Sequence, residues 1–454
     1  MPTYQRGTMK RLEIACAILI CAALLFLSRA HFSRQQPTGA APPLASPPKN
    51  IVLIVIDTLR ADHLQTYGYA RDTAPFLEEI SSRGVVFEKV FPTSSWIAPA
   101  TASLFTALYP SQHGVITGHN ATRKLRKKFS HIVLNRIPDQ LETLPELLGK
   151  AGYSTFGISD NFKVFREMGF GDGFERLDSA WYRGGDEVNA IATRWKEDLL
   201  VADRYFLYLH YVDPHQPYHK REPWFEAAQG QPASTIARYD SEISYVDGMI
   251  RKLFDEFQWQ DDTLLIVTSD HGEEFLDHGN WGHDKTLFTE VLHIPLIVYH
   301  PSLKPARLKG HASILNIYPT LRELLGGSRE NDLEGVSLLP ALRGVHALPG
   351  SRALFAELIK RKEGANRSVR SVLEGKWDFI EQSRQDSQVA GFLFDLKADS
   401  REQRNQGALF PQIVASLRKK NRTGPRDTLA VVPEAITLPI DEEELKRLRS
   451  LGYV

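Results

Sequence analysis

The chain has 454 residues, and its 55 Lys and Arg are balanced by 55 Asp and Glu. This length is enough for a large core and for more than one domain. The balanced charge provides no overall field for a polyanion, so we do not expect nucleic acid as a partner. Both cysteines, Cys16 and Cys21, lie near the N-terminus. The rest of the chain therefore contains no disulfide, thiol metal ligand or cysteine nucleophile.

Residues 1–30 have the pattern of a targeting segment. Arg6, Lys10 and Arg11 precede an apolar run over residues 14–27. This run is short for a spanning helix, which needs about 20 residues, and no small-x-small cleavage site follows it. We expect an uncleaved membrane anchor rather than a cleaved signal. Either alternative places the folded body outside the cytoplasm, as a periplasmic, cell-surface or secreted protein.

The body begins after a linker rich in Pro and Ala over residues 31–49. Over residues 50–345 strands alternate with amphipathic helices, which predicts a mostly parallel sheet with helices on both faces. The expected strands are 51–56, 153–159, 204–212, 264–269 and 295–300, and the expected helices are 74–83, 143–151, 241–257 and 317–325.

After residue 345 the pattern changes to short strands separated by polar turns. The expected strands are 369–373, 376–380 and 391–396, followed by a basic helix over 411–420. Short strands joined by turns are typical of antiparallel sheets. We predict a small antiparallel α+β subdomain over residues 346–425. A charged tail over 426–454 should contain a short helix from residue 441.

Two of the expected strands end abruptly in residues that can bind a metal. Strand 51–56 is followed by Asp57, and strand 264–269 by Asp270 and His271. The carboxyl ends of parallel strands meet at one edge of a sheet, where α/β folds place their sites. Two carboxylates and an imidazole can hold one divalent cation. Ca²⁺, Mg²⁺, Mn²⁺ and Zn²⁺ all remain open.

Several sequence blocks, in order, resemble the sulfatase family of the alkaline-phosphatase superfamily. They are residues 51–64, 102–110, 211–218, 239–243, 269–273, 282–286 and 396–399. The resemblance implies an α/β fold of the alkaline-phosphatase type, an α/β/α sandwich with a mostly parallel mixed sheet plus the small antiparallel subdomain. It also implies a metal-dependent hydrolase of sulfate esters such as sulfated glycans or aryl sulfates.

The same resemblance implies roles for residues around the cation. His215 and Lys285 would bind the anionic group of the ester, and His283 would protonate the leaving group. His113 would be a further contact to the substrate. We therefore expect His215, His283 and Lys285 to be catalytic, and His113, His215 and Lys285 to bind the substrate.

Two residues depart from the usual sulfatase pattern at the cation. Thr58 stands where many sulfatases have a second Asp, and His271 stands where many have Asn. Both departures resemble relatives that act on phosphonate esters or transfer phosphoglycerol, and they favour Mn²⁺ or Zn²⁺ over Ca²⁺. A phosphodiesterase, phosphonate-ester hydrolase or phosphoryl-group transferase is therefore the alternative enzyme.

The position that resembles the family's nucleophile holds Ile97. Pro99 fixes the register, since the family's Cys, Ser or Thr stands two residues before a proline, and Thr101 replaces the usual Arg. Isoleucine has no lone pair, so neither formylglycine nor a covalent intermediate can form there. Three interpretations remain: attack by Ser94 or Ser95, attack by metal-activated hydroxide, or a non-catalytic protein that binds an anion or a metal.

Overall fold

The computed structural model describes residues 42–116, 131–161, 163–328, 333–345, 348, 352–360, 367–384, 387–425, 435–439 and 446. Residues 46–454 belong to one compact unit, which contains the sheets and helices of the fold. The predicted anchor over residues 1–30 lies outside the described residues. Within the described ranges, no helix combines the length and the hydropathy needed to cross a membrane.

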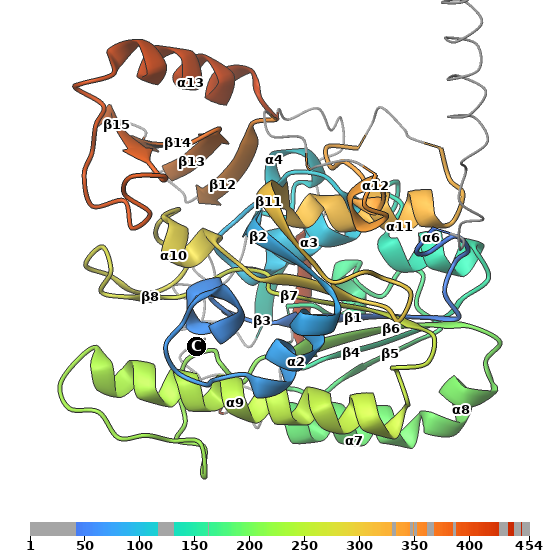
Figure 1. The fold of residues 1–454 in the computed structure, drawn as a ribbon. Coiled ribbons are helices and arrows are strands. Elements are labelled where there is room, and N and C mark those ends of the chain that lie inside the picture. The colour runs from blue at the N-terminus through green and yellow to red at the C-terminus, as the bar shows by residue number, and fades with distance from the viewer. Residues whose placement is uncertain are drawn as a thin grey trace, which may run out of the picture. The chain divides into compact units, whose positions relative to one another are not determined.

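An eight-stranded sheet forms the centre of the fold (Figure 1). Its strand order is β11-β2-β10-β7-β1-β6-β4-β5, and of these strands only β10 runs against the common direction. The strands are β1 (Asn50–Ile56), β2 (Val85–Phe91), β4 (Ser154–Ser159), β5 (Arg176–Ser179), β6 (Tyr205–Tyr211), β7 (Thr263–Thr268), β10 (Leu296–Tyr299) and β11 (Ala306–Ser313). The predicted mostly parallel mixed sheet is confirmed.

The three central strands, β1, β6 and β7, are buried on both faces. Every residue of β6 and β7 is buried, as is every residue of β1 after Asn50. Continuous burial of this kind is typical of parallel strands that are covered by helices. Because their sequences are nearly continuous apolar runs, the pattern predicts the ends of these strands to within one residue. The strands β2, β5 and β11 were not predicted.

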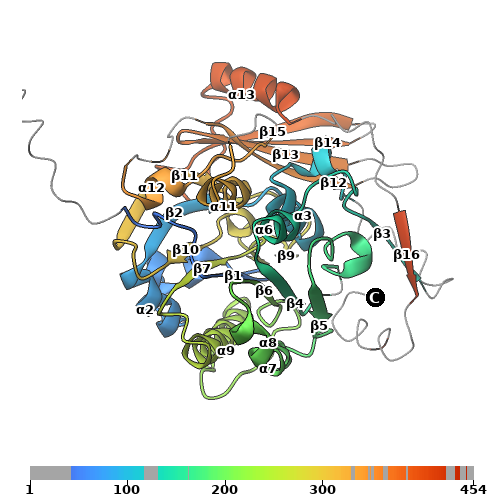
Figure 2. The ribbon, with the colours of Figure 1, turned by 90° about the vertical axis from the view of Figure 1, so that its right-hand side faces the viewer.

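Helices cover both faces of this sheet (Figures 1 and 2). One layer contains α2 (Pro75–Arg83), α7 (Gly185–Arg194), α8 (Lys196–Val201) and α9 (Ala233–Glu256), and the other contains α3 (Ile97–Thr106), α6 (Leu144–Lys150) and α11 (Ile317–Leu324). Shorter helices are α4 (Pro110–His113), α10 (Thr289–Leu292) and α12 (Leu339–Leu342). The arrangement confirms the predicted α/β/α sandwich.

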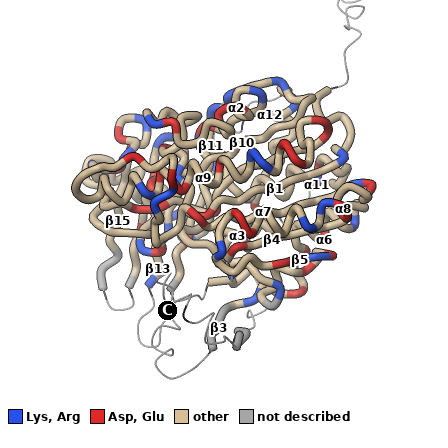
Figure 3. Tube along the Cα trace, turned by 90° about the horizontal axis from the view of Figure 1, so that it is seen from below, with Lys and Arg blue, Asp and Glu red and all other residues tan. Residues whose placement is uncertain are grey.

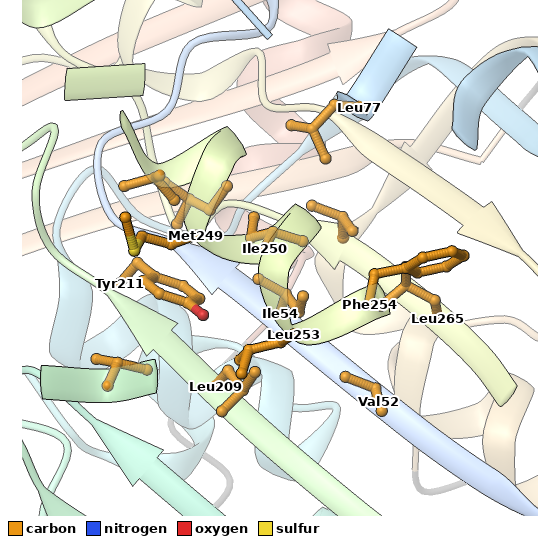
Figure 4. Close-up of a cluster of buried hydrophobic side chains, with 14 of the residues drawn as sticks. Val52, Ile54, Leu77, Leu209, Tyr211, Met249, Ile250, Leu253, Phe254 and Leu265 are labelled. Atoms are coloured by element: carbon orange, nitrogen blue, oxygen red, sulfur yellow. The ribbon is translucent and has the colours of Figure 1, made fainter. Parts of the chain in front are cut away.

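The longest helix, α9, packs an apolar stripe on the central strands (Figure 4). The figure shows Met249, Ile250, Leu253 and Phe254 of α9 against Val52 and Ile54 of β1, Leu209 and Tyr211 of β6, Leu265 of β7 and Leu77 of α2. This helix begins at Ala233, whereas the sequence pattern predicted residue 241. The start was missed because buried polar residues such as Asp240 and Glu242 interrupt the apolar period.

A second, antiparallel sheet follows near the C-terminus. Its strands pair in chain order and are β12 (Leu354–Lys360), β13 (Arg367–Glu374), β14 (Trp377–Arg384) and β15 (Ser387–Asp395). Helix α13 (Pro411–Thr423) buries Leu417 against Val372, Phe379 and Leu393 of this sheet. The predicted antiparallel subdomain is confirmed, with β12 as an additional strand. The proposed domain boundary at residue 345 stays a prediction.

Two short strand pairs complete the described structure. Strand β3 (His131–Asn135) pairs with β16 (Ala435–Pro439), and β8 (Glu274–Phe275) pairs with β9 (Trp281–Gly282). Beyond residue 439 only Lys446 is described, so the tail helix expected from residue 441 lies outside the described residues. Figure 3 shows Lys and Arg positions interspersed with Asp and Glu positions along α7, α8 and α9.

Candidate functional site

The residues predicted to bind a metal come from two neighbouring strands of the large sheet. Asp57 directly follows β1. Asp270 and His271 follow β7, and one residue, Ser269, separates Asp270 from the end of that strand. The two strands pair in parallel, so their carboxyl ends lie at the same edge. Strand β6 pairs with β1 on its other side and leads into the loop that carries His215. The topology therefore gathers these residues at one edge of the sheet.

Three buried ligand atoms converge at this edge. One atom each from Asp57, Asp270 and His271 lies within 4.8 Å of the other two. His271 Nε2 is 3.4 Å from Asp57 Oδ1 and 3.6 Å from Asp270 Oδ2. None of these three atoms has a hydrogen-bond partner among the described residues. Buried polar atoms need a partner, and one divalent cation can serve all three, so the donor set fits a cation.

Hydrogen bonds around the three side chains hold them in position for a metal. His271 Nδ1 lies 2.9 Å from the Gly272 carbonyl oxygen, so this nitrogen carries the proton and Nε2 presents its lone pair. Asn161 Nδ2 donates to Asp57 Oδ2 at 3.2 Å, and the backbone N–H of His271 donates to Asp270 Oδ1 at 2.9 Å. Outer partners of this kind orient the ligands of metal sites.

The electrostatics of the site also favour a cation. Burial raises the pKa of Asp57 well above its usual value, and the charge of Asp270 raises it further. Burial raises the pKa of Asp270 to about 7. The Lys163 ammonium lowers both pKa values, but one cation does not balance two buried carboxylates. A bound metal ion would supply the missing positive charge.

A second group of side chains lies against the metal ligands. The ring of His283 is centred 4.5 Å from the ring of His271 and 4.9 Å from that of His215. His283 Nδ1 lies 3.0 Å from Glu273 Oε1, and the Tyr218 hydroxyl donates to Glu273 Oε2 at 2.8 Å. Glu273 is fully buried. The Tyr218–Glu273 pair therefore fixes the orientation of the His283 ring beside the cation site.

The other predicted substrate-binding residues lie around His283. His215 is 7% exposed, and its Nδ1 lies 2.6 Å from the Gln216 carbonyl oxygen. Burial and the neighbouring His283 lower the pKa of His215 well below its usual value, so the ring is neutral. Lys285 is exposed two residues after His283, and its Nζ donates to the Trp281 carbonyl oxygen at 2.5 Å. The structure thus brings His215 and His283 together, with Lys285 on the adjoining loop.

His113 has a different environment from the other predicted site residues. It is fully buried, its Nε2 lies 3.0 Å from Ser103 Oγ, and its Nδ1 accepts from the backbone N–H of Val115. Burial lowers the pKa of His113 to about 3. Both ring nitrogens are engaged within the fold, so His113 holds α3 to the segment that follows α4. Its contact with a substrate stays a prediction and forms no part of the proposed function.

The N-terminus of α3 also lies beside the site. Ile97 is the first residue of α3 and is 2% exposed. The backbone N–H of Asp284 donates to the Ser95 carbonyl oxygen at 3.0 Å, which holds the start of α3 against the loop after β9. The Ser94 hydroxyl donates to the Glu357 carbonyl oxygen at 2.7 Å. The buried hydroxyl of Ser95 has no such partner in the described part of the chain.

Four residues of the site had no role in the sequence prediction: Asn161, Lys163, Tyr218 and Glu273. Asn161 and Lys163 follow β4, which pairs with β6 at the same edge of the sheet. Lys163 is 4% exposed, and its ammonium lies 5.8 Å from the centre of the Trp96 ring. Because the sequence predicted the end of β4, the polar residues Asn161 and Lys163 after it could have been recognised as candidate site residues. Glu273 and Tyr218 were signalled only by their places in the family-like blocks.

Comparisons with known proteins agree with this fold. The family model described as Sulfatase matches residues 49–327. An N-acetylgalactosamine-6-sulfatase from Canis lupus familiaris is 24% identical over 356 residues, which is 66% of this chain and 67% of that protein. The structure of a phosphonate monoester hydrolase of Agrobacterium radiobacter has a TM-score of 0.67 at 19% identity, covering 83% of this chain and 95% of that one. A 2-O GAG sulfatase has a TM-score of 0.63 at 17% identity, covering 82% and 91%.

Proposed function

Because the chain belongs to the sulfatase family, a family of ester hydrolases, we propose that it is a metal-dependent hydrolase of sulfate esters. The observation that carries this proposal is the convergence of three buried ligand atoms of Asp57, Asp270 and His271. His283 and His215 lie against them. Relatives and structural neighbours are named for sulfated sugars and phosphonate esters, which supports an anionic ester as the substrate.

Asp57, Asp270 and His271 would hold one divalent cation. When bound, such a cation neutralises the anionic oxygens of the ester and lowers the pKa of water. The imidazole in this donor set favours Mn²⁺ or Zn²⁺ over Ca²⁺, since Ca²⁺ prefers oxygen ligands.

The remaining residues bind the ester and move protons. His215 contacts the ester beside His283, Lys285 donates hydrogen bonds to the sulfate oxygens, and Lys163 adds positive charge from the loop after β4. His283, oriented by Glu273, gives a proton to the ester oxygen as it leaves. Ile97 cannot form a covalent intermediate, so water attacks the sulfur directly.

A phosphodiester or phosphonate ester is the second candidate substrate. The Asp270–His271 pair favours it, as does the similarity in fold to a phosphonate monoester hydrolase. The chemistry required of His283 and of the cation site is the same for phosphorus as for sulfur.

We place this activity outside the cytoplasm. The basic residues and the apolar run in residues 1–30 would tether the body to a membrane, and the segment 31–49 would hold it away from the surface.

The test is turnover of aryl sulfate, aryl phosphodiester and aryl phosphonate substrates by the purified chain with Mg²⁺, Ca²⁺, Mn²⁺ or Zn²⁺. Asp270→Asn keeps the shape of the side chain but removes a ligand charge. It should lower kcat/KM by at least about 100-fold and weaken metal binding in calorimetry. Asp255→Asn, on the exposed side of α9, is the matched control and should match the unmodified protein.

The substrate that turns over fastest selects between the sulfate and phosphorus esters. Metal binding that is lost in Asp270→Asn, with no turnover of any substrate, would reject hydrolysis and identify a protein that binds the anion or metal only. Activity that survives Asp270→Asn would reject the cation site itself.

A further inference from the structure

The loop over residues 180–184 follows β5 and is tied to the end of β4. Its five successive backbone N–H groups all donate to Ser159 or Asp160, at distances from 2.9 to 3.2 Å. Within it, Trp181 and Tyr182 have φ angles of 52° and 56°, in the left-handed region that residues other than Gly rarely adopt. Backbone of this kind persists only where its surroundings fix it, and it is concentrated at functional sites.

The side chain that this loop directs toward the cation site is that of Tyr182. Its hydroxyl lies 2.7 Å from Asn161 Oδ1, and the backbone N–H of Lys163 donates to the same atom at 2.9 Å. A backbone N–H can only donate, so the atom that faces Lys163 is the amide oxygen. The Tyr182 hydroxyl therefore also donates to this oxygen. The amide nitrogen of Asn161 is then directed to Asp57 Oδ2, at 3.2 Å.

The two carboxylates of the cation site are held by different kinds of donor. Asp270 Oδ1 accepts from the backbone N–H of His271 at 2.9 Å, and the position of that donor is fixed by the chain itself. Asp57 Oδ2 accepts from the side-chain amide of Asn161, which has two rotatable bonds of its own. The orientation of this amide depends on the donors to its oxygen, and the Tyr182 hydroxyl is one of them.

The hydrogen bond from Asn161 decides which oxygen of Asp57 faces the other ligand atoms. Because Oδ2 is engaged by the amide, Oδ1 is the oxygen that lies 3.4 Å from His271 Nε2. Asp57 Oδ1 and Asp270 Oδ2 have no hydrogen-bond partner in the described part of the chain. Each carboxylate thus keeps one oxygen for a cation, and on the Asp57 side this division depends on a side chain that Tyr182 holds.

Resting on the function proposed above, we propose that Tyr182 is a positioning residue for the cation site, and that it sets the affinity for the cation through Asn161 and Asp57. Loss of its hydroxyl removes one of the two hydrogen bonds that orient the Asn161 amide. The amide then turns more freely, and Asp57 Oδ1 is held less firmly toward the cation. Partners of metal ligands typically change metal affinity by about 10- to 100-fold.

The test is a calorimetric titration of Mn²⁺ and Zn²⁺ into the purified full-length chain, after a chelator has removed bound metal. Tyr182→Phe deletes the hydroxyl and keeps the ring, and it should raise the Kd of both ions about 10-fold. The control is Tyr69→Phe, since Tyr69 is also half-buried and its hydroxyl donates to Asp240 Oδ2 at 2.8 Å. The control should lower the midpoint of urea unfolding as Tyr182→Phe does, but leave the Kd unchanged. A Kd unchanged in Tyr182→Phe would overturn the proposal.

A double-mutant cycle tests whether Tyr182 acts through Asn161. Asn161→Ala removes the amide, so it should weaken binding of both ions at least as much as Tyr182→Phe does. In the Asn161→Ala background, Tyr182→Phe should then change the Kd no further, because the residue through which it acts is gone. A further 10-fold loss in the double variant would reject the route through Asn161, and the proposal with it.

Failure of the proposed function gives a different result from failure of this role. A protein that binds Mn²⁺ or Zn²⁺ but turns over no ester would reject hydrolysis, and the comparison of Kd values would still decide the role of Tyr182. Turnover of an ester together with an unchanged Kd in Tyr182→Phe would reject the role of Tyr182 alone. An unmodified protein that binds neither ion would reject both.

Discussion

At the scale of single residues, the site depends on what each side chain's other atoms are doing. His271 can offer Nε2 to a cation because Nδ1 is held by the Gly272 carbonyl oxygen. The His283 ring lies beside His271 because its Nδ1 is bonded to Glu273, which is in turn held by the Tyr218 hydroxyl. His113, in contrast, uses both ring nitrogens within the fold. The same residue type therefore has three different roles, which its bonding partners decide.

Ile97→Thr tests whether position 97 is the nucleophile's place in this fold. A hydroxyl at the start of α3 would lie beside the cation site and could attack the ester, so turnover of an aryl phosphodiester should rise about 10-fold or more. Ile97→Val has the same shape as the threonine variant without the hydroxyl, and serves as the control. Equal rates in the two variants would contradict the register assigned through Pro99.

At the scale of elements, a buried carboxyl pair joins the second sheet to the body. Asp378 on β14 and Glu402 after β15 are 3% and 2% exposed. Glu402 Oε2 accepts from the backbone N–H of Thr289 at the start of α10, at 2.6 Å. Burial raises the pKa of Asp378 to about 6, and burial together with the charge of Asp378 raises the pKa of Glu402 well above its usual value.

The pair predicts that stability falls as pH rises. Both carboxyl groups hold protons in the folded state that the unfolded chain loses at about pH 4, so their contribution is full below that pH. The contribution of Asp378 is lost as pH rises through about 6, and that of Glu402 is lost as pH rises through its own raised pKa. The Gln side chain of the Glu402→Gln variant cannot ionise. Above pH 5 the unfolding free energy of the variant should therefore fall less steeply with pH than that of the unmodified protein, and the two slopes should differ by up to about 1.4 kcal/mol per pH unit. Urea unfolding at several pH values measures this, with Glu197→Gln on exposed α8 as the control. Parallel pH profiles for all three proteins would contradict it.

At the scale of the whole molecule, we expect residues 1–30 to attach the folded body to a membrane. Acidic and basic positions are interspersed along α7, α8 and α9 (Figure 3). We expect attachment to a membrane through the N-terminal segment. Expressed in full, the protein should pellet with membranes and resist extraction at alkaline pH, whereas removal of residues 1–35 should release it. Full-length protein recovered entirely in the soluble fraction would refute the anchor.

Much of the fold could be predicted because its central strands are unusually regular. Nearly unbroken apolar runs in β1, β6 and β7 identify a parallel sheet, and their abrupt ends identify Asp57, Asp270 and His271 as candidate ligands. The strands β2 and β11, at one side of the sheet, were missed because charged residues such as Glu88 and Lys89 interrupt their pattern.

The sequence alone determined the fold class, the family and the three residues that converge on one point, because each depends on a local run or on spacing along the chain. Only the tertiary structure decided which polar atoms are left without partners. That property depends on contacts across long separations, such as Asn161 with Asp57 or Tyr218 with Glu273. The same is true of two further buried atoms, Thr101 Oγ1 and His210 Nε2. Nothing in the local sequence around either residue indicates that its polar atom lacks a partner among the described residues.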